Sequence, residues 1–309
     1  MRYIIEPHSD GKLLRDYLRA IGISASLLAR LKRREDGIVL NGRRVTVRAV
    51  LSAGDCLELA VEDSAAPEKI LPTDLPLEIL LQTPDFLVVN KPPMMPTHPS
   101  HGHFTDTLAN ALAFHFSTQS EPFVPRFINR LDRDTTGVVL VARHALAAAT
   151  LSSLMAARKI TKHYLALVRG RLDTPTVIET GIRRRAESII FREACPVGEG
   201  DFAKTEVFPI AWGDDLSLVR LIPHTGRTHQ LRAHLASVGH PLLGDGLYGE
   251  ASLLIDRHAL HAVGLSFSYP DGGEHYHIGA PLPADWGKAL ALLGKEAILL
   301  AEQECRQKL

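Results

Sequence analysis

A proline-rich stretch constrains the architecture of this chain more than any other feature. Residues 62–76, EDSAAPEKILPTDLP, contain three prolines and few candidates for a core. Proline has no backbone N–H and disrupts helices and central strands, so we expect a linker over 63–76. A small domain, 1–62, then precedes the linker, and a larger domain, 77–309, follows it. The 309 residues, 45% of them apolar, are enough for two hydrophobic cores.

The small domain combines two helical patterns with a hairpin signal. Either Ser9 or Asp10 can cap a first helix, whose apolar residues recur at helical spacing over 13–21. Ser24 can cap a second helix. The Asn-Gly pair at 41–42 is the favoured two-residue turn of a β-hairpin. We therefore expect two helices followed by a hairpin.

Positive charge gathers in the small domain. The whole chain has 35 Lys and Arg against 35 Asp and Glu, which excludes a uniformly basic surface. Residues 26–48 nevertheless hold seven basic and two acidic side chains, a local net charge of +5. A solvated helix face is the ordinary explanation of such a run. Because these residues fall on two neighbouring elements, we instead expect a phosphate-binding surface, made by Arg30, Lys32, Arg33, Arg34, Arg43 and Arg44.

The larger domain mixes strands and helices irregularly. Ala, Leu and Met dominate 145–158 and predict a helix, and Thr228 can cap another helix that runs to Val238. Irregular interleaving favours an α+β fold over a regular array of βαβ units. Short apolar runs predict strands at 79–81, 86–89, 138–141, 160–168 and 216–222.

A polar run directly before one of these strands is the first candidate for chemistry. Residues 129–137 read NRLDRDTTG, and the apolar strand follows at once. Loops at a sheet edge often carry catalytic groups, and Asp132 is the group of interest here. The same composition is also ordinary for a turn, so the loop alone leaves both interpretations open.

A second candidate is the run PHTGRTHQLRAH at 223–234. It places Arg227 in a glycine-containing loop and Arg232 in the first turns of a helix. Arginine can grip a carboxylate with two parallel hydrogen bonds and favours its ionised form. His229 and His234 are five positions apart and do not share a helix face, which disfavours a metal site.

Two shorter segments also contain residues of interest. At the start of a strand, alternation puts Lys162 and Tyr164 on one face and His163 on the other. Without other information, Tyr164 would be a core residue. Residues 244–249, GDGLYG, match G-x-G-x-x-G by spelling, but no strand is expected to run into them. We therefore expect no dinucleotide site there.

Cysteine usage and the N-terminus indicate where such a chain works. The three cysteines, Cys56, Cys195 and Cys305, are far apart, so neither a disulfide framework nor a thiolate metal site is indicated. The first residues lack the apolar run of a signal peptide, and no segment is apolar enough to cross a membrane. We expect a soluble cytoplasmic protein.

Taken together, the segments resemble the RluA-type family of pseudouridine synthases. The family loop usually begins with His where this chain has Asn129. The small domain resembles the RNA-binding domain of the ribosomal protein S-four type. Seven matches lie in the family's order within 77–270: DFLVVNKPP at 85–93, PTHP at 96–99, the loop at 130–137, KHY at 162–164, the run at 225–234, GHPLLGD at 239–245 and LHA at 260–262.

The resemblance implies a fold, an activity and a site. The α+β domain should contain a mixed, largely antiparallel sheet with flanking helices. The enzyme should be an isomerase that converts uridine in ribosomal or transfer RNA to pseudouridine, without cofactor or metal, as a monomer. Asp132 is implied as the catalytic carboxylate and Arg232 as its ionic partner. Tyr164 should pack on the flipped base and can assist in removing the proton from carbon 5. The substrate-binding residues are then Arg130, which fills the vacated space, Arg227 and Leu260.

Two alternatives remain open at this stage. A glycoside hydrolase could use Asp132 and Asp134 as a carboxylate pair, although alternation sends them to opposite sides of an extended segment. A non-catalytic RNA-binding or ribosome-assembly protein could use the same fold. The combination of Asp132, Tyr164 and Arg232 argues against lost catalysis.

Overall fold

The computed structural model describes residues 1–62, 67, 70–270 and 272–306. Part of the expected linker, 63–66 and 68–69, lies outside the described residues. In the described part of the chain, no helix is long and apolar enough to cross a membrane.

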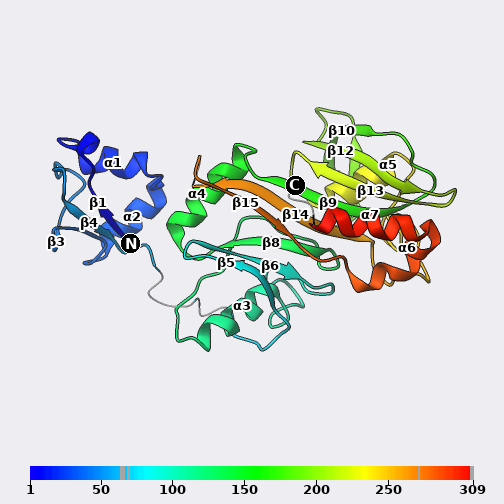
Figure 1. Cartoon of the computed structure of the whole chain (residues 1–309), viewed down its shortest axis with the longest axis horizontal. Helices are drawn as coiled ribbons and strands as arrows, with labels where there is room; N and C mark the ends of the chain where they lie inside the picture. The colour runs from blue at the N-terminus through cyan, green and yellow to red at the C-terminus, as the bar shows by residue number, and fades with distance from the viewer. Residues whose placement is uncertain (63–66, 68–69, 271, 307–309) are drawn as a thin grey trace.

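The N-terminal part forms a four-stranded antiparallel sheet with two helices. The strand order is β1-β4-β2-β3. Figure 1 shows this unit, in blue, beside helix α4 of the remainder. Its elements are β1 (Arg2–Ile4), the 3-10 helix η1 (Pro7–Ser9), α1 (Leu14–Ala20), α2 (Ala25–Arg33), β2 (Ile38–Leu40), β3 (Arg43–Arg44) and β4 (Cys56–Leu59).

One of the two expected helix caps is confirmed and the other is wrong. The Ser24 side chain accepts a hydrogen bond from the Leu27 N–H at 3.2 Å and caps α2. Ser9 ends the 3-10 helix instead, and α1 begins at Leu14 without a side-chain cap. The first N–H groups of α1 are satisfied by distant backbone, since Leu14 N–H donates to the carbonyl of Ala49.

The hairpin turn is confirmed, since Asn41 and Gly42 both have positive φ, 51° and 75°. The small unit has its own apolar core, built around Leu14, Leu18 and Leu31. Leu146 at the start of α4 also packs into this core. The N-terminal unit therefore packs against α4.

The larger part contains an eleven-stranded sheet with flanking helices, which agrees with the predicted α+β class. Its main path is β11-β10-β12-β13-β9-β14-β8-β6-β5, with β15 beside β14 and β7 beside β8. Among the described strands, β14 and β8 pair in parallel and the other pairs are antiparallel. The strands are β5 (Glu78–Gln82), β6 (Phe86–Lys91), β7 (Arg126–Phe127), β8 (Thr136–Ala142), β9 (Thr161–Arg169), β10 (Thr176–Arg184), β11 (Arg192–Cys195), β12 (Asp201–Trp212), β13 (Leu216–Pro223), β14 (Leu260–Tyr269) and β15 (Glu274–Gly279).

Helices cover both faces of the central strands, which explains their continuous apolar runs. In β8, Val139 and Val141 face a core shared with α3 and α5, whereas Val138 and Leu140 face a core shared with α4. Two further helices, α6 and α7, cover the β9 and β13 region (Figure 1). The helix bounds are α3 (Leu108–Ser117), α4 (Ala145–Ala156), α5 (Gln230–Ser237), η2 (Ala284–Trp286), α6 (Gly287–Leu293) and α7 (Lys295–Arg306).

Helix α5 begins differently from the expectation. Thr228 does not cap it. The N-cap position is His229, in the left-handed conformation with φ 55°, and no side chain caps the helix. That backbone conformation turns His229 out of the helix, so that its ring contacts residues outside α5. Gly239, with φ 86°, follows the end of the helix.

Candidate active site

Asp132 lies in a loop that other segments hold in place from both sides. Thr97 donates a hydrogen bond from its hydroxyl to the Leu131 carbonyl at 3.1 Å. On the other side, the Lys91 ammonium donates to the Arg133 carbonyl at 2.8 Å. The Leu131 side chain is buried in the core below. The backbone of Asp132 is thus fixed at its two neighbours, while its side chain stays partly exposed.

Lys91 is a buried residue to which the sequence analysis assigned no role. Its side chain is fully buried at the end of β6, where it also donates to the carbonyls of Pro92 and Met95, each at 2.8 Å. Burial lowers the pKa of this ammonium to about 7. The three carbonyls come from two loops, so Lys91 joins the 92–95 loop to the loop of Asp132.

Gly137 explains how this loop reaches strand β14. At φ 108°, it faces the backbone of β14, and a Cβ added there would lie 2.1 Å from the Ala262 carbonyl oxygen. Only glycine allows the parallel pairing of Gly137 with Ala262. That pairing brings Leu260, the first residue of β14, to the Asp132 loop.

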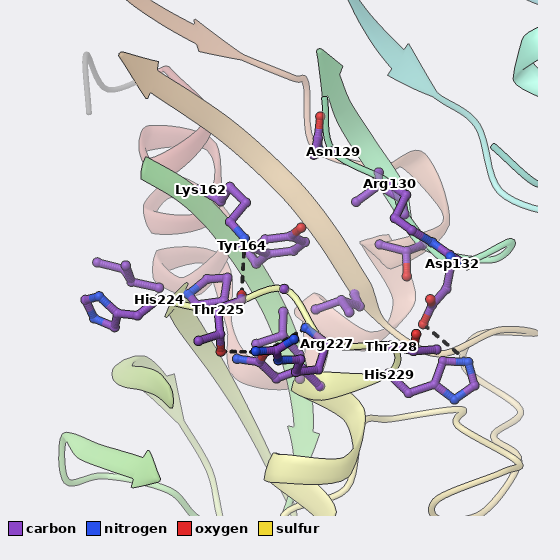
Figure 2. Close-up of a pocket in the computed structure, with 18 of the residues that line it drawn as sticks. Asn129, Arg130, Asp132, Lys162, Tyr164, His224, Thr225, Arg227, Thr228 and His229 are labelled. Atoms are coloured by element: carbon purple, nitrogen blue, oxygen red, sulfur yellow. Dashed lines mark hydrogen bonds and ion pairs between the residues drawn. The ribbon is translucent and has the colours of Figure 1, made fainter. Parts of the chain in front are cut away.

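The predicted catalytic and substrate-binding residues line one cavity of about 460 Å³. The walls come from the Asp132 loop, the start of β9, the 223–229 loop and α5 (Figure 2). The cavity therefore joins segments that lie more than a hundred positions apart in the chain. The predicted residues that line it are Arg130, Asp132, Tyr164, Arg227, Arg232 and Leu260.

The expected contact between Asp132 and Arg232 is present, but it is long. One guanidinium nitrogen, Nη1, lies 3.5 Å from Asp132 Oδ2, and His229 Nε2 lies 3.8 Å from the same oxygen. Figure 2 marks the His229 contact. Charge-assisted hydrogen bonds are shorter, about 2.7–2.9 Å. The shorter bonds of Arg232 go to Asp245, at 2.7 Å from both Nε and Nη2.

Tyr164 and Lys162 project from the same face of β9 into the cavity, as alternation predicted (Figure 2). Tyr164 is 7% exposed, and burial, reinforced by the negative charge of Asp132, raises the pKa of its phenol above its usual range. The phenol therefore stays neutral. Lys162 donates to the Thr225 carbonyl at 3.2 Å, which ties β9 to the loop of Arg227.

Asn129 forms side-chain hydrogen bonds with the backbone of strand β8. Its side-chain amide donates to the Val138 carbonyl at 3.1 Å and accepts from the Leu140 N–H at 2.8 Å. Figure 2 shows its side chain pointing away from Asp132. Asn129 therefore fixes the start of the Asp132 loop against β8.

Arg227 connects the cavity with a second hollow. It is exposed, and its Nε donates to the Phe202 carbonyl at 3.2 Å. The second hollow measures about 450 Å³ and shares the 226–228 loop with the first. It is also lined by Arg183, Arg184 and Arg192. A basic surface thus continues beyond the cavity.

Asp134, the partner of a possible carboxylate pair, does not line the cavity. Its two oxygens receive the guanidinium of Arg133 at 3.1 and 3.0 Å. The geometry of a two-carboxylate glycoside hydrolase is therefore not formed by Asp132 and Asp134.

The histidines of the 223–234 run point to different partners. His229 contacts the Tyr248 hydroxyl through Nδ1 at 3.0 Å, whereas His234 contacts the hydroxyls of Thr205 and Thr180. Within the described part of the chain, no group of three or more His, Cys, Asp or Glu side chains could hold a metal ion.

The predicted phosphate-binding residues form one surface of the N-terminal unit. Arg30, Lys32 and Arg33 belong to α2, and Arg43 and Arg44 form β3. The Arg44 guanidinium donates to the Lys32 carbonyl at 3.3 Å, which joins the two elements. Arg34 differs from the others, because it grips Asp36 with two hydrogen bonds of 2.9 and 2.7 Å.

Comparison with known proteins agrees with this fold. Residues 85–237 match the family model described as RNA pseudouridylate synthase. The chain is 37% identical to the Bacillus subtilis RNA pseudouridine synthase YjbO, over 90% of this chain and 98% of that protein. It is 34% identical to ribosomal large subunit pseudouridine synthase D of Vibrio cholerae, over 87% of each chain. The solved structure of human RNA Pseudouridylate Synthase Domain Containing 1 aligns with a TM-score of 0.54 and 30% identity, covering 68% of this chain and 85% of that chain.

These similarities define a pseudouridine synthase, an isomerase that acts on RNA. Within that class, the chain belongs to the RluA-type family, as the ordered motifs predicted. The resemblance of the N-terminal unit to an S-four-type domain stays a prediction.

Proposed function

We propose that this enzyme isomerises particular uridines of structured RNA and that Asp132 is the carboxylate that carries the reaction. The observation in support is the cavity, in which Asp132 lies together with Tyr164 and Arg232. The Asp132 side chain is 21% exposed and opens into the cavity, while its loop is fixed on both sides. A substrate can therefore reach a carboxylate whose position is set in advance.

In the proposed reaction, the bond between the ribose and the uracil nitrogen breaks, and a bond from the ribose to carbon 5 forms. Carbon 5 loses its proton and the released nitrogen gains one, so nothing enters or leaves. Asp132 acts on the ribosyl–base unit, either as nucleophile or as a charge that stabilises a cationic ribose. Arg232 and His229 flank one of its oxygens.

The uridine must leave its stack to reach Asp132, so the proposal includes base flipping. The ring of Tyr164 supplies a surface on which the flipped base stacks, worth about 1–3 kcal/mol. That offsets part of the unstacking cost of a few kcal/mol. Arg130 is exposed at the rim of the cavity, where its side chain can fill the space that the base has left.

The RNA target that we propose is ribosomal. One relative of similar length is named ribosomal large subunit pseudouridine synthase D. Two basic surfaces support a large RNA substrate: the α2–β3 surface of the N-terminal unit, and the hollow beside Arg227. We propose that the first captures the RNA and that the second receives the backbone next to the flipped nucleotide.

Pseudouridine mapping in total RNA from cells with and without this gene tests the function. We expect one or a few pseudouridines to disappear from ribosomal RNA, and to return with the wild-type gene but not with the Asp132→Ala gene. Loss from transfer RNA alone would replace the proposed target. An unchanged map, together with RNA binding but no turnover by the purified protein, would establish a non-catalytic RNA-binding protein instead.

A further inference from the structure

The GDGLYG turn at 244–249 has a role in this structure that does not involve a nucleotide. Gly244 has φ +73°, and a Cβ added there would lie 2.3 Å from the Arg257 carbonyl oxygen. The glycine therefore permits a close approach between two backbone segments. The turn places the Asp245 side chain, which is fully buried, against Arg232 of α5.

Arg232 is shared unequally by two carboxylates. Asp245 receives two hydrogen bonds from the guanidinium, both of 2.7 Å, in the parallel geometry that arginine forms with a carboxylate. Asp132 receives only the third nitrogen, at 3.5 Å. Among the described residues, no ionisable group lies closer than this to the Asp132 carboxylate. The ring of His229 lies at 3.8 Å.

The backbone of the turn holds Asp245 in this position. Asp245 Oδ1 accepts hydrogen bonds from the N–H groups of Leu247 at 3.1 Å and Tyr248 at 3.2 Å. Burial acts to raise the pKa of this carboxyl, but the bonds and charge of Arg232 outweigh it, and the pKa lies below its usual value. Asp245 is therefore an ionised, fully engaged carboxylate.

Tyr248 holds the guanidinium from another direction. Its ring lies 4.9 Å from Arg232 Cζ, in the geometry of a cation–π contact. Its hydroxyl accepts a hydrogen bond from the Arg192 N–H at 2.9 Å and lies 3.0 Å from His229 Nδ1. Burial lowers the pKa of His229, whose other ring nitrogen, Nε2, faces Asp132.

The cluster thus contains two carboxylates and one guanidinium, with the guanidinium committed to the carboxylate farther from the cavity. We propose that Asp245 is a positioning residue that withholds Arg232 from a two-bond pair with Asp132 and so leaves the Asp132 carboxylate free to react with the ribosyl–base unit. A carboxylate with both oxygens tied to arginine must break those bonds before it can attack. This inference rests on the proposed role of Asp132 and adds the residue that regulates its partner.

The substitution Asp245→Asn tests the inference, because it keeps the shape and one oxygen but removes the charge that holds Arg232. We expect Arg232 to turn to Asp132. The single-turnover rate at saturating enzyme should fall by at least about tenfold, whereas the dissociation constant for RNA should stay within about twofold. The acid limb of the pH–rate profile should move to lower pH, since Asp132 then has the guanidinium to itself.

A matched control is Glu121→Gln. Glu121 also receives a two-bond contact from an arginine, Arg143, which lies over the ring of Phe116, and none of the three lines the cavity. This variant should keep the wild-type rate and pH profile. A wild-type rate in Asp245→Asn would overturn the inference. So would a rate that falls only in proportion to the folded fraction, with an unmoved pH profile, because that result indicates a purely structural role.

A crystal structure of the Asp132→Asn variant provides a second test that leaves the buried site untouched. We expect the two bonds between Arg232 and Asp245 to be unchanged. An Arg232 that leaves Asp245 in this variant would show that Asp132 holds it, and would overturn the inference. Activity in Asp132→Ala would instead refute the proposed function, so the two failures are distinguishable.

Discussion

The α2–β3 surface and the Asp132 cavity both present arginine, but they hold its charge in opposite ways. In the N-terminal unit, Lys32, Arg33 and Arg43 are exposed. In the cavity, the Arg232 side chain is 9% exposed and lies between two carboxylates. The charges of the N-terminal unit are therefore accessible to solvent, whereas the guanidinium of Arg232 is held in one geometry.

Under the proposed function, the exposed arginines bind RNA and the buried one supports the reaction. Exposed charges are screened over about 8–10 Å at physiological salt and can serve phosphates in many positions. A buried pair acts in a medium of low dielectric constant, where small displacements change the interaction strongly. We therefore expect substitutions in the N-terminal unit to change affinity and its salt dependence, and substitutions in the cavity to change the rate.

The largest expected effect comes from Asp132→Ala. Pseudouridine formation should fall by at least about a thousandfold, because the group that acts on the ribosyl–base unit is lost. RNA affinity and the thermal midpoint should stay close to wild type, since this side chain is partly exposed and lacks short hydrogen bonds in the described structure. A single-turnover assay with a binding assay on the same RNA checks both. An equal loss of RNA affinity and of reaction rate would contradict the proposed separation of RNA binding from catalysis.

Tyr164→Leu should have the next largest effect. Leucine fills much of the same core volume but offers no aromatic face, so about 1–3 kcal/mol of base stacking is lost. We expect the rate to fall by about 10–100-fold, with stability reduced only slightly. Tyr164→Phe is the matched control for stacking, because it removes only the hydroxyl. If Phe and Leu were equally inactive, the hydroxyl rather than the stacking face would be the essential feature.

Replacing Lys32, Arg33 and Arg43 together by Gln should weaken RNA binding by about tenfold at physiological salt. The slope of log affinity against log salt should become shallower by about 2–3, because up to three phosphate contacts are removed. The rate at saturating RNA should be unchanged. Arg306→Gln is the control, since Arg306 is exposed on α7, outside this surface. An unaltered salt slope in the triple variant would contradict a phosphate-binding role for the N-terminal unit.

The smallest effect concerns acid stability. Burial lowers the pKa of His163, His234 and His258 to about 4, and that of His261 to about 3. Unfolded histidines titrate near pH 6.5, so between pH 6.5 and 4 the unfolded chain binds more protons, and stability falls as pH falls. As the pH falls from 6.5 to 5.5, each of these histidines should lower the free energy of unfolding by about 1 kcal/mol.

Fluorescence of the two tryptophans, Trp212 and Trp286, follows this unfolding in the larger part. The N-terminal unit carries one histidine, His8, so we expect it to be less sensitive to acid. His258→Gln, which can still bond to Thr135, should remove about 1 kcal/mol of the pH dependence. A urea midpoint that does not change with pH would refute this account.

Much of the fold follows from local sequence. The run VVLV at 138–141 predicted a strand, and the Asn-Gly pair predicted a hairpin turn. The helix caps were predicted less accurately. Ser9 and Thr228 have the residue types that cap helices, but α1 takes its first acceptors from distant backbone, and α5 begins at a left-handed His229. A cap depends on where other segments lie, which a local pattern does not contain.

Motif order alone predicts that Asp132, Tyr164 and Arg232 belong to one site, and all three line the same cavity. How these residues share charge depends on the folded chain. The commitment of Arg232 to Asp245 rather than to Asp132 depends on differences of less than 1 Å between segments that meet only in the folded chain. Electrostatic and hydrogen-bond energies change steeply over such distances, whereas motif spacing carries no information about them.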